Sequence, residues 1–220
     1  MNFDLILPTN KKSSGKNTCE ILVLHHTGGG TFSGNMKYLA TNKAPASAHY
    51  VVGSAGEVGK IGEDTDILWQ AGLSKWLNKK DLNKYSIGIE IVNTGDNFTD
   101  IQRNKVDELA IELIKKHNIK KENLVRHKDI APGRKNDPYD TLWNTRFKTF
   151  DEYKNYLFSK LTIMSVIGFY EEIYNKENPT GGKVIKDIKG ATTKLINKDG
   201  TINGKEMVYF MGIIAERLGK

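Results

Sequence analysis

The sequence predicts an α/β protein in which a β-sheet is flanked by helices, followed by a small, mainly helical C-terminal domain. Short runs rich in Ile, Val and Leu have the length and composition of buried strands. Segments whose apolar residues recur at helical spacing separate these runs. Strands that alternate with helices indicate a sheet with helices packed against it.

Four segments are predicted strands. Residues 19–26, CEILVLHH, form an almost continuous apolar run with polar residues at its end, as expected of a strand buried on both faces. Residues 48–53 and 58–61 are predicted strands joined by a turn at residues 54–57. Residues 86–92, SIGIEIV, form the last strand. Because α/β sheets tend to place their sites at strand ends, the polar residues found there are candidates for function.

Helices are predicted between and after these strands. Residues 35–41 form a short helix, and residues 100–117 form a longer one that has polar residues at its start and apolar residues at helical spacing. Residues 124–137 are predicted to be a loop because Pro and Gly interrupt them. Residues 149–163 are again predicted to be helical.

The sequence changes character near residue 162, which predicts a larger domain at residues 1–162 and a small helical domain at residues 163–220. Helices are expected at 166–175 and 205–218. The aromatic and basic residues of the second domain would suit cell-wall targeting, and the alternative is that they are simply core and solvated surface. A segment around Asp199 partly resembles a calcium-binding loop. However, a leucine stands where the first acidic ligand belongs, so a helical packing unit is the favoured interpretation.

Composition restricts the class of protein. The chain has 220 residues, 38% of them hydrophobic and 27% charged, which suits a globular protein with one well-buried core. Its longest apolar run is far shorter than the roughly 20 residues that a membrane span needs, and residues 1–17 do not resemble a secretory signal. The net charge of +7 favours an anionic partner. No nucleic-acid-binding motif is evident, and a polyanionic cell wall fits the charge equally well.

Two histidines and an aspartate have the residue types of a catalytic zinc site. His25 lies at the end of the first predicted strand, and His127 and Asp137 flank a loop constrained by Pro132 and Gly133. Catalytic zinc usually takes three protein ligands and leaves one position for water, whose pKa it lowers from about 15.7 to about 7. A histidine at a strand end is, by itself, more often structural. The three residues together favour a zinc hydrolase.

Glu90 and Lys135 are candidate catalytic residues. Glu90 lies within the apolar strand SIGIEIV, where burial would raise its pKa and suit it to act as a general base. A buried, salt-bridged glutamate is the alternative. Lys135 precedes Asp137 by two residues, so its ammonium could stabilise an oxyanion near the metal. A solvated lysine in a basic loop is the alternative there.

Five blocks of sequence resemble a known enzyme family. They are, in order, VLHHT, SAHYVVGSAGEVGKI, WQAG, SIGIEIVN and RHKDIAPGRKNDP. Together they resemble the zinc-dependent N-acetylmuramoyl-L-alanine amidases, which share their fold with peptidoglycan recognition proteins and phage lysozyme-type amidases. The resemblance covers roughly residues 18–145. Its last block is the most specific, because it places a histidine, a lysine and an aspartate in one loop.

The resemblance implies a central mixed β-sheet surrounded by helices, with zinc in a surface groove. It implies hydrolysis of the amide between N-acetylmuramic acid and the L-alanine of peptidoglycan. His25, His127 and Asp137 would hold Zn²⁺, Glu90 would be the catalytic acid/base, and Lys135 would stabilise the oxyanion.

Three positions can be compared with the residues that are usual in the family. Ala48 stands where some relatives have a catalytic tyrosine, and Gln70 where the WQAG block often has histidine. His49 matches a common family position and is expected to be packed or to lie behind a ligand rather than to bind metal.

The expected setting is a phage endolysin, made in the cytoplasm without a signal peptide and acting on the cell wall after release. A cytosolic amidase that recycles muropeptides is the nearest alternative. A non-catalytic peptidoglycan-binding protein of the same fold is a second, and a basic nucleic-acid-binding protein is a third. The partner expected here is peptidoglycan, with no nucleic acid and no membrane span.

Overall fold

The computed structural model describes residues 1–41, 45–95, 98–139, 146–177, 203 and 207. The chain divides into two compact units, Met1–Leu142 and Trp143–Lys220. Among the described residues, no helix is both long enough and apolar enough to traverse a bilayer.

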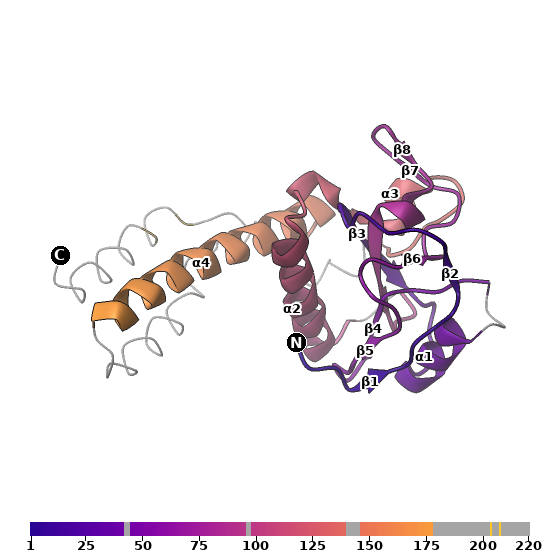
Figure 1. Ribbon diagram of the computed structural model, residues 1–220, viewed down its shortest axis with the longest axis horizontal. Coiled ribbons are helices and arrows are strands. Elements are labelled where there is room, and N and C mark those ends of the chain that lie inside the picture. Colours follow the sequence, from indigo (N-terminus) through magenta and orange to yellow (C-terminus); the bar gives the residue numbers. More distant parts are fainter. Residues whose placement is uncertain (42–44, 96–97, 140–145, 178–202, 204–206, 208–220) are drawn as a thin grey trace. The chain divides into compact units, whose positions relative to one another are not determined.

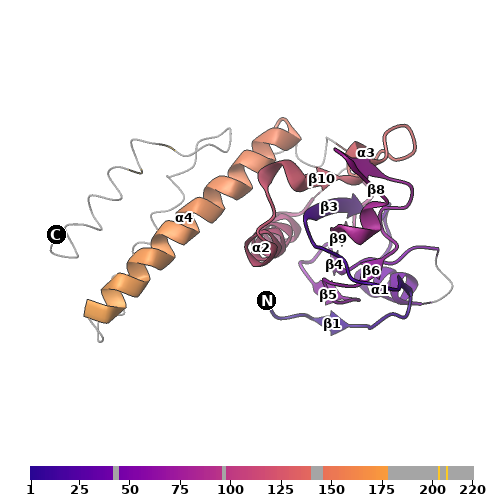
Figure 2. The same ribbon diagram turned by 45° about the horizontal axis from the view of Figure 1, so that its top comes forward.

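The first unit is built on a six-stranded mixed sheet, which confirms the predicted fold class. Its strand order is β1-β5-β4-β9-β3-β10, which can be followed from one edge to the other in Figure 2. Strands β4, β9, β3 and β10 are parallel to one another, whereas β5 runs antiparallel to β4. The strands are β1 (Leu5–Ile6), β3 (Ile21–His26), β4 (Tyr50–Val52), β5 (Val58–Lys60), β9 (Ser86–Ile91) and β10 (Leu124–Arg126).

Two small two-stranded sheets and two 3-10 helices complete the connections. Strand β2 (Lys12–Ser13) pairs with β6 (Ile67–Leu68), and β7 (Lys75–Trp76) pairs with β8 (Lys79–Lys80) in a hairpin. The 3-10 helices are η1 (Leu82–Lys84) and η2 (Lys121–Asn123). The segment between β6 and β7 packs on the main sheet, where its Ala71 joins a buried cluster with Ile21 and Val23 of β3.

Helices cover both faces of the sheet. Helix α2 (Asp100–His117) packs on one face against β3 and β4, and α1 (Phe32–Ala40) and the short α3 (His127–Ile130) lie on the other (Figures 1 and 2). Thr99 caps the start of α2 by accepting a hydrogen bond from the Gln102 amide. Asn118 ends it in the left-handed conformation. The sequence-predicted bounds of α2 are therefore confirmed.

Apolar side chains from β3 and β9 form the centre of the core. Alternation along β3 sends Ile21, Val23 and His25 to one face and Leu22 and Leu24 to the other. Ile21 and Val23 pack in a buried cluster with residues from the β6–β7 segment, η1, β10 and α3. His25 continues the same row, so its side chain emerges at the end of a rigid, packed face.

Residues 124–137 differ from the loop that the sequence predicts. Residues 124–126 form β10, which pairs with β3, and residues 127–130 form α3. The loop prediction is therefore wrong for residues 124–130. Strand β10 has three residues, too few to show alternation in the sequence. It forms because its backbone pairs with β3 at the edge of the sheet.

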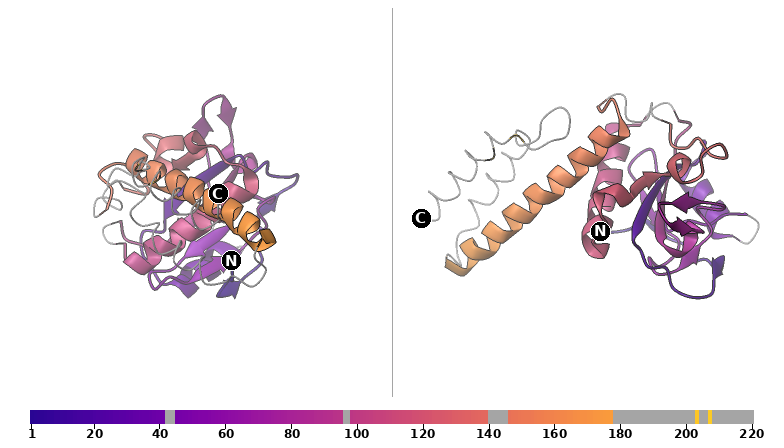
Figure 3. Two further views of the ribbon diagram at one scale, coloured as in Figure 1. Left: turned by 90° about the vertical axis from the view of Figure 1, so that its left-hand side faces the viewer. Right: turned by 90° about the horizontal axis from the view of Figure 1, so that it is seen from above.

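The C-terminal helices also differ from the prediction. The helices expected at 149–163 and 166–175 are one helix, α4 (Phe150–Glu177), which is drawn as a continuous orange coil in Figure 3. The division into domains 1–162 and 163–220 stays a prediction. The calcium-loop-like segment around Asp199 lies outside the described residues, as does nearly all of the helix expected at 205–218.

A buried carboxylate ties the end of α2 to the rim of the sheet. The Asp64 side chain, 5% exposed, accepts hydrogen bonds from Tyr50 Oη, from Lys116 Nζ at 2.7 Å and from His117 Nε2 at 2.7 Å. The His117 side chain, at the end of α2, is 16% exposed because it is bound to Asp64. Asp64 is separated from Lys116 by 52 positions and from His117 by 53, so no local pattern in the sequence indicates these contacts.

Candidate active site

The register of the parallel strands brings the candidate ligands to one edge. His25 pairs with Glu90 across β3 and β9, so their side chains share a face. Strand β10 pairs with β3 so that Arg126 lies opposite Leu24, and His127 follows directly. The carboxyl ends of three adjacent strands therefore present His25, Glu90 and His127 side by side, as α/β sheets commonly do with functional residues.

Asp137 reaches this edge because the preceding loop folds back on α3. The Lys128 amide donates to the Asp137 carbonyl at 2.8 Å. The amides of Arg134 and Lys135 both donate to the Ala131 carbonyl, at 3.1 and 2.9 Å, which closes the turn between them. The loop that Pro132 and Gly133 constrain thus brings the Asp137 carboxylate beside the two histidines.

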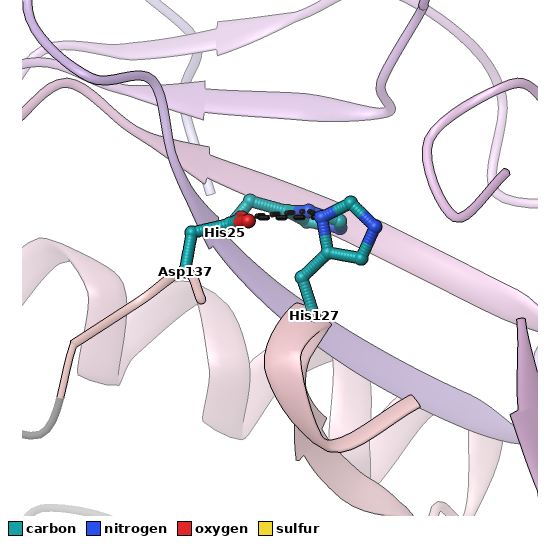
Figure 4. A group of neighbouring side chains, drawn as sticks. All are labelled: His25, His127 and Asp137. Atoms are coloured by element: carbon teal, nitrogen blue, oxygen red, sulfur yellow. Dashed lines mark hydrogen bonds and ion pairs between the residues drawn. The ribbon is translucent and has the colours of Figure 1, made fainter. Parts of the chain in front are cut away.

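Three ligand atoms converge as the sequence predicts (Figure 4). His25 Nδ1 lies 2.9 Å from His127 Nδ1, and Asp137 Oδ2 lies 3.2 Å from His127 Nδ1 and 3.6 Å from His25 Nδ1. A tetrahedral zinc ion with bonds of about 2.0–2.1 Å separates its ligand atoms by about 3.4 Å. The three distances bracket that value, so the spacing of these atoms fits a zinc ion.

The Nδ1 atoms of both rings are free to face a metal because each Nε2 has an acceptor of its own. His25 Nε2 lies 2.5 Å from Gln70 Oε1, and His127 Nε2 lies 3.3 Å from the Ala71 carbonyl. A neutral imidazole whose Nε2 carries the proton presents its Nδ1 lone pair. Both rings therefore offer a ligand atom to the same point.

The protonation preferences of the three residues differ. Burial lowers the pKa of His25, but the carboxylates of Glu90 and Asp137 outweigh it, so the pKa is raised above its usual value. At His127 burial prevails and the pKa is lowered. Burial raises the pKa of Asp137, yet hydrogen bonds with His127 and His25 outweigh it and hold the pKa far below its usual range. The site thus keeps an ionised carboxylate beside a neutral imidazole, a set that attracts a cation.

Glu90 stands at the side of this cluster. Its Oε1 lies 4.0 Å from His25 Nδ1, and its side chain is 15% exposed. Burial raises its pKa, an effect that Asp137 increases and that His25 and Lys135 oppose. A carboxylate with a raised pKa that still reaches solvent has the properties of a general base.

Lys135 lies on the exposed loop and contributes through its charge. Its side chain is exposed. Its positive charge lowers the pKa of both Glu90 and His127, so it lies near enough to influence the site. The structure brings His25, His127, Asp137 and Glu90 together, whereas Lys135 stands at the rim, and its role at the oxyanion stays a prediction.

Two other histidines lie near the site without joining the cluster. His26 turns to the opposite face, where its ring lies 4.9 Å from that of Tyr139. His49 is fully buried, accepts a hydrogen bond from the Gly88 amide and donates to the Asp66 carbonyl. Burial lowers its pKa to about 4, so it stays neutral. The expectation that His49 is packed rather than a ligand agrees with these contacts.

Comparisons with known proteins find one family of similar enzymes. Residues 15–140 match a family model described as N-acetylmuramoyl-L-alanine amidase. The N-acetylmuramoyl-L-alanine amidase AmiD of Escherichia coli is 32% identical over 136 residues, which are 54% of this chain and 48% of AmiD. The 1,6-anhydro-N-acetylmuramyl-L-alanine amidase AmpD of Haemophilus influenzae is 34% identical over 94 residues, 42% of this chain and 51% of AmpD. The chain thus spans about half the length of these relatives.

Solved structures show the same fold. The complex of E. coli AmiD with anhydro-N-acetylmuramic acid-L-Ala-D-gamma-Glu-L-Lys superposes with a TM-score of 0.53 at 29% identity. The match covers 60% of this chain and 58% of AmiD.

Proposed function

The chain belongs to the N-acetylmuramoyl-L-alanine amidase family, and on that basis we propose that it is a zinc hydrolase of peptidoglycan. The bond cut is the amide between the lactyl group of N-acetylmuramic acid and L-alanine. The observation that carries the proposal is the convergence of His25 Nδ1, His127 Nδ1 and Asp137 Oδ2, at 2.9–3.6 Å from one another, beside a carboxylate of raised pKa.

His25, His127 and Asp137 are the residues that would hold the metal. Zinc, when bound, acts as a Lewis acid and lowers the pKa of a coordinated water to about 7. Three protein ligands leave one position open, which distinguishes catalytic zinc sites from structural ones. The donor set of two imidazoles and a carboxylate suits zinc.

Glu90 is the proposed proton carrier. Its carboxylate accepts a proton from the attacking water, and the oxygen of that water forms the new bond to the lactyl carbonyl carbon. When the C–N bond breaks, Glu90 returns the proton to the departing alanine nitrogen. Burial favours this exchange, since a carboxyl group whose pKa lies nearer to neutrality both accepts and releases a proton readily.

Lys135 is proposed to stabilise the negative oxygen that forms at the carbonyl. Its charge already acts on Glu90 and His127. Its ammonium sits on a long, exposed side chain that can reach over the site. A cation aimed at the developing oxyanion contributes most in the transition state.

Identification of the products tests the proposal. Purified peptidoglycan digested by the full chain should yield stem peptides with a free L-alanine amino group and glycan strands with free lactyl carboxyl groups, measured by mass spectrometry. Glu90→Gln should slow the release of both products by about 10²–10⁴-fold, while Glu108→Gln, which alters an exposed carboxylate on α2, should release them at the wild-type rate. Cleavage at another bond, or no release by the wild type, would contradict the amidase proposal and favour a protein that only binds peptidoglycan.

We further propose that the enzyme acts on the intact wall, as an endolysin would. The basic charge supports this setting because walls are often polyanionic. The alternative is a cytosolic recycling amidase, and it draws support from the likeness to AmpD, named for a 1,6-anhydro substrate. Rates on whole walls and on soluble anhydromuropeptides separate the two, because an endolysin prefers the former and a recycling enzyme the latter.

A further inference from the structure

We propose that Gln70 and Ala71, two adjacent residues anchored by Asn83, set the ring tautomers of both metal-binding histidines. The inference rests on the proposed function in one respect, namely that the two histidines bind metal. The tautomers are properties of the chain itself, so they can be measured even if the chain binds no metal. None of these three residues ligates metal in the scheme above, so they are positioning residues.

A chain of hydrogen bonds fixes the orientation of the Gln70 amide. The Ser86 hydroxyl donates to the Leu82 carbonyl at 2.6 Å. Its oxygen is therefore left to accept from Gln70 Nε2, at 2.6 Å. This contact turns Gln70 Oε1 toward His25 Nε2, which lies 2.5 Å away. Because the amide oxygen can only accept, the proton of His25 must lie on Nε2.

The strand below Gln70 is shaped to admit it. Gly88 and Ser86 lie on the face of β9 that also carries Glu90. A Cβ atom on Gly88 would lie 2.8 Å from Gln70 Cγ and 3.0 Å from Oε1. Gln70 is 5% exposed, so its side chain fills the space that this glycine leaves. Gly88 in SIGIEIV therefore leaves the room that the Gln70 side chain occupies.

Ala71 serves His127 through its backbone. The Ala71 carbonyl accepts from His127 Nε2 at 3.3 Å and from the Arg134 guanidinium at 2.8 Å. A carbonyl, too, can only accept, so the proton of His127 is also directed to Nε2. Adjacent residues therefore direct both Nδ1 lone pairs toward the same point.

Asn83 holds the pair in place. Its side-chain oxygen accepts from the amides of both Gln70 and Ala71, at 3.1 and 2.8 Å. The dipeptide is thereby fixed to η1, whose Leu82 is fully buried. Outer groups that orient metal-binding histidines typically change metal affinity about 10–100-fold when they are removed.

Long-range ¹H–¹⁵N NMR of the metal-free full chain tests the inference, with zinc affinity measured separately by competition with a chromophoric chelator. At a pH high enough to keep both rings neutral, each ring of the wild type should carry its single proton on Nε2. Gln70→Met removes the acceptor at similar volume, so His25 should populate the other tautomer and zinc affinity should fall about 10–100-fold. Gln70→Glu restores an acceptor and should recover both properties.

Gln102→Met is the matched control. Gln102 is also fully buried, and its amide donates to the carbonyls of Val52 and Val92, away from the histidines. This variant should leave the tautomers and the zinc affinity unchanged. Asn83→Ala provides a second test, because releasing the dipeptide should weaken zinc binding even though Asn83 touches neither ring.

The outcomes separate this inference from the proposed function. Unchanged His25 tautomer and zinc affinity in Gln70→Met would overturn the inference while leaving the zinc enzyme intact. A wild type that binds no zinc would overturn the proposed function, and the NMR comparison would still decide whether Gln70 sets the tautomer.

Discussion

Asp64 provides a stability prediction whose size follows from the structure. Burial raises the pKa of this carboxyl group, but hydrogen bonds from Lys116, Tyr50 and His117 outweigh burial and hold the pKa at about 2 instead of 3.8. Each pKa unit corresponds to about 1.4 kcal/mol, so the ionised form stabilises the folded chain by about 2 kcal/mol. Since the folded pKa is depressed, this stabilisation is fully present above pH 3.8 and is lost as pH falls through 2.

The test compares the wild type with Asp64→Asn, which keeps the shape of the side chain and removes its charge. Urea unfolding at a series of pH values should show the variant less stable at neutral pH. The difference between the two free energies of unfolding should then shrink by about 2 kcal/mol by pH 2. Asp81→Asn is the control, because Asp81 forms an exposed ion pair with Lys84, and such pairs contribute about 0–1 kcal/mol. A difference for Asp64→Asn that stays constant with pH would refute the reasoning.

Three further predictions concern the site. Glu90→Gln should lower kcat about 10²–10⁴-fold with zinc content unchanged, as measured by turnover and metal analysis; equal turnover would remove Glu90 from proton transfer. Gly88→Ala should displace Gln70, because the added Cβ would lie 2.8 Å from Gln70 Cγ. Chelator competition should then show weaker zinc binding. An affinity equal to that of the wild type would show that the Gln70 side chain has room to move. The affinity for zinc should rise as pH increases through 6.5 and above, because the raised pKa of His25 keeps a competing proton on the ring at lower pH. A zinc affinity that does not change with pH would contradict this prediction.

The strands and the convergence of His25, His127 and Asp137 were predictable because each leaves a local pattern in the sequence. Apolar runs predicted β3 and β9, and the constrained loop between His127 and Asp137 predicted their convergence on His25. The face that Glu90 shares with His25 also follows from alternation, once the register of the two strands is known.

The remaining features depend on contacts between distant residues. Strand β10 consists of three residues and owes its existence to its pairing with β3. Gln70 looked like a departure from the family pattern, yet its contact with His25 crosses 45 positions of sequence. Asn83 lies outside all of the matched blocks, and it is identified only by the two backbone amides that its side chain binds.

Metal reconstitution tests the central claim most directly. The chain stripped of metal should be inactive. It should bind one equivalent of zinc and regain peptidoglycan cleavage in proportion to the zinc bound. His25→Ala and His127→Ala should neither bind zinc at this affinity nor regain cleavage. Full hydrolysis by the metal-free chain, or undiminished zinc binding by these variants, would contradict the account.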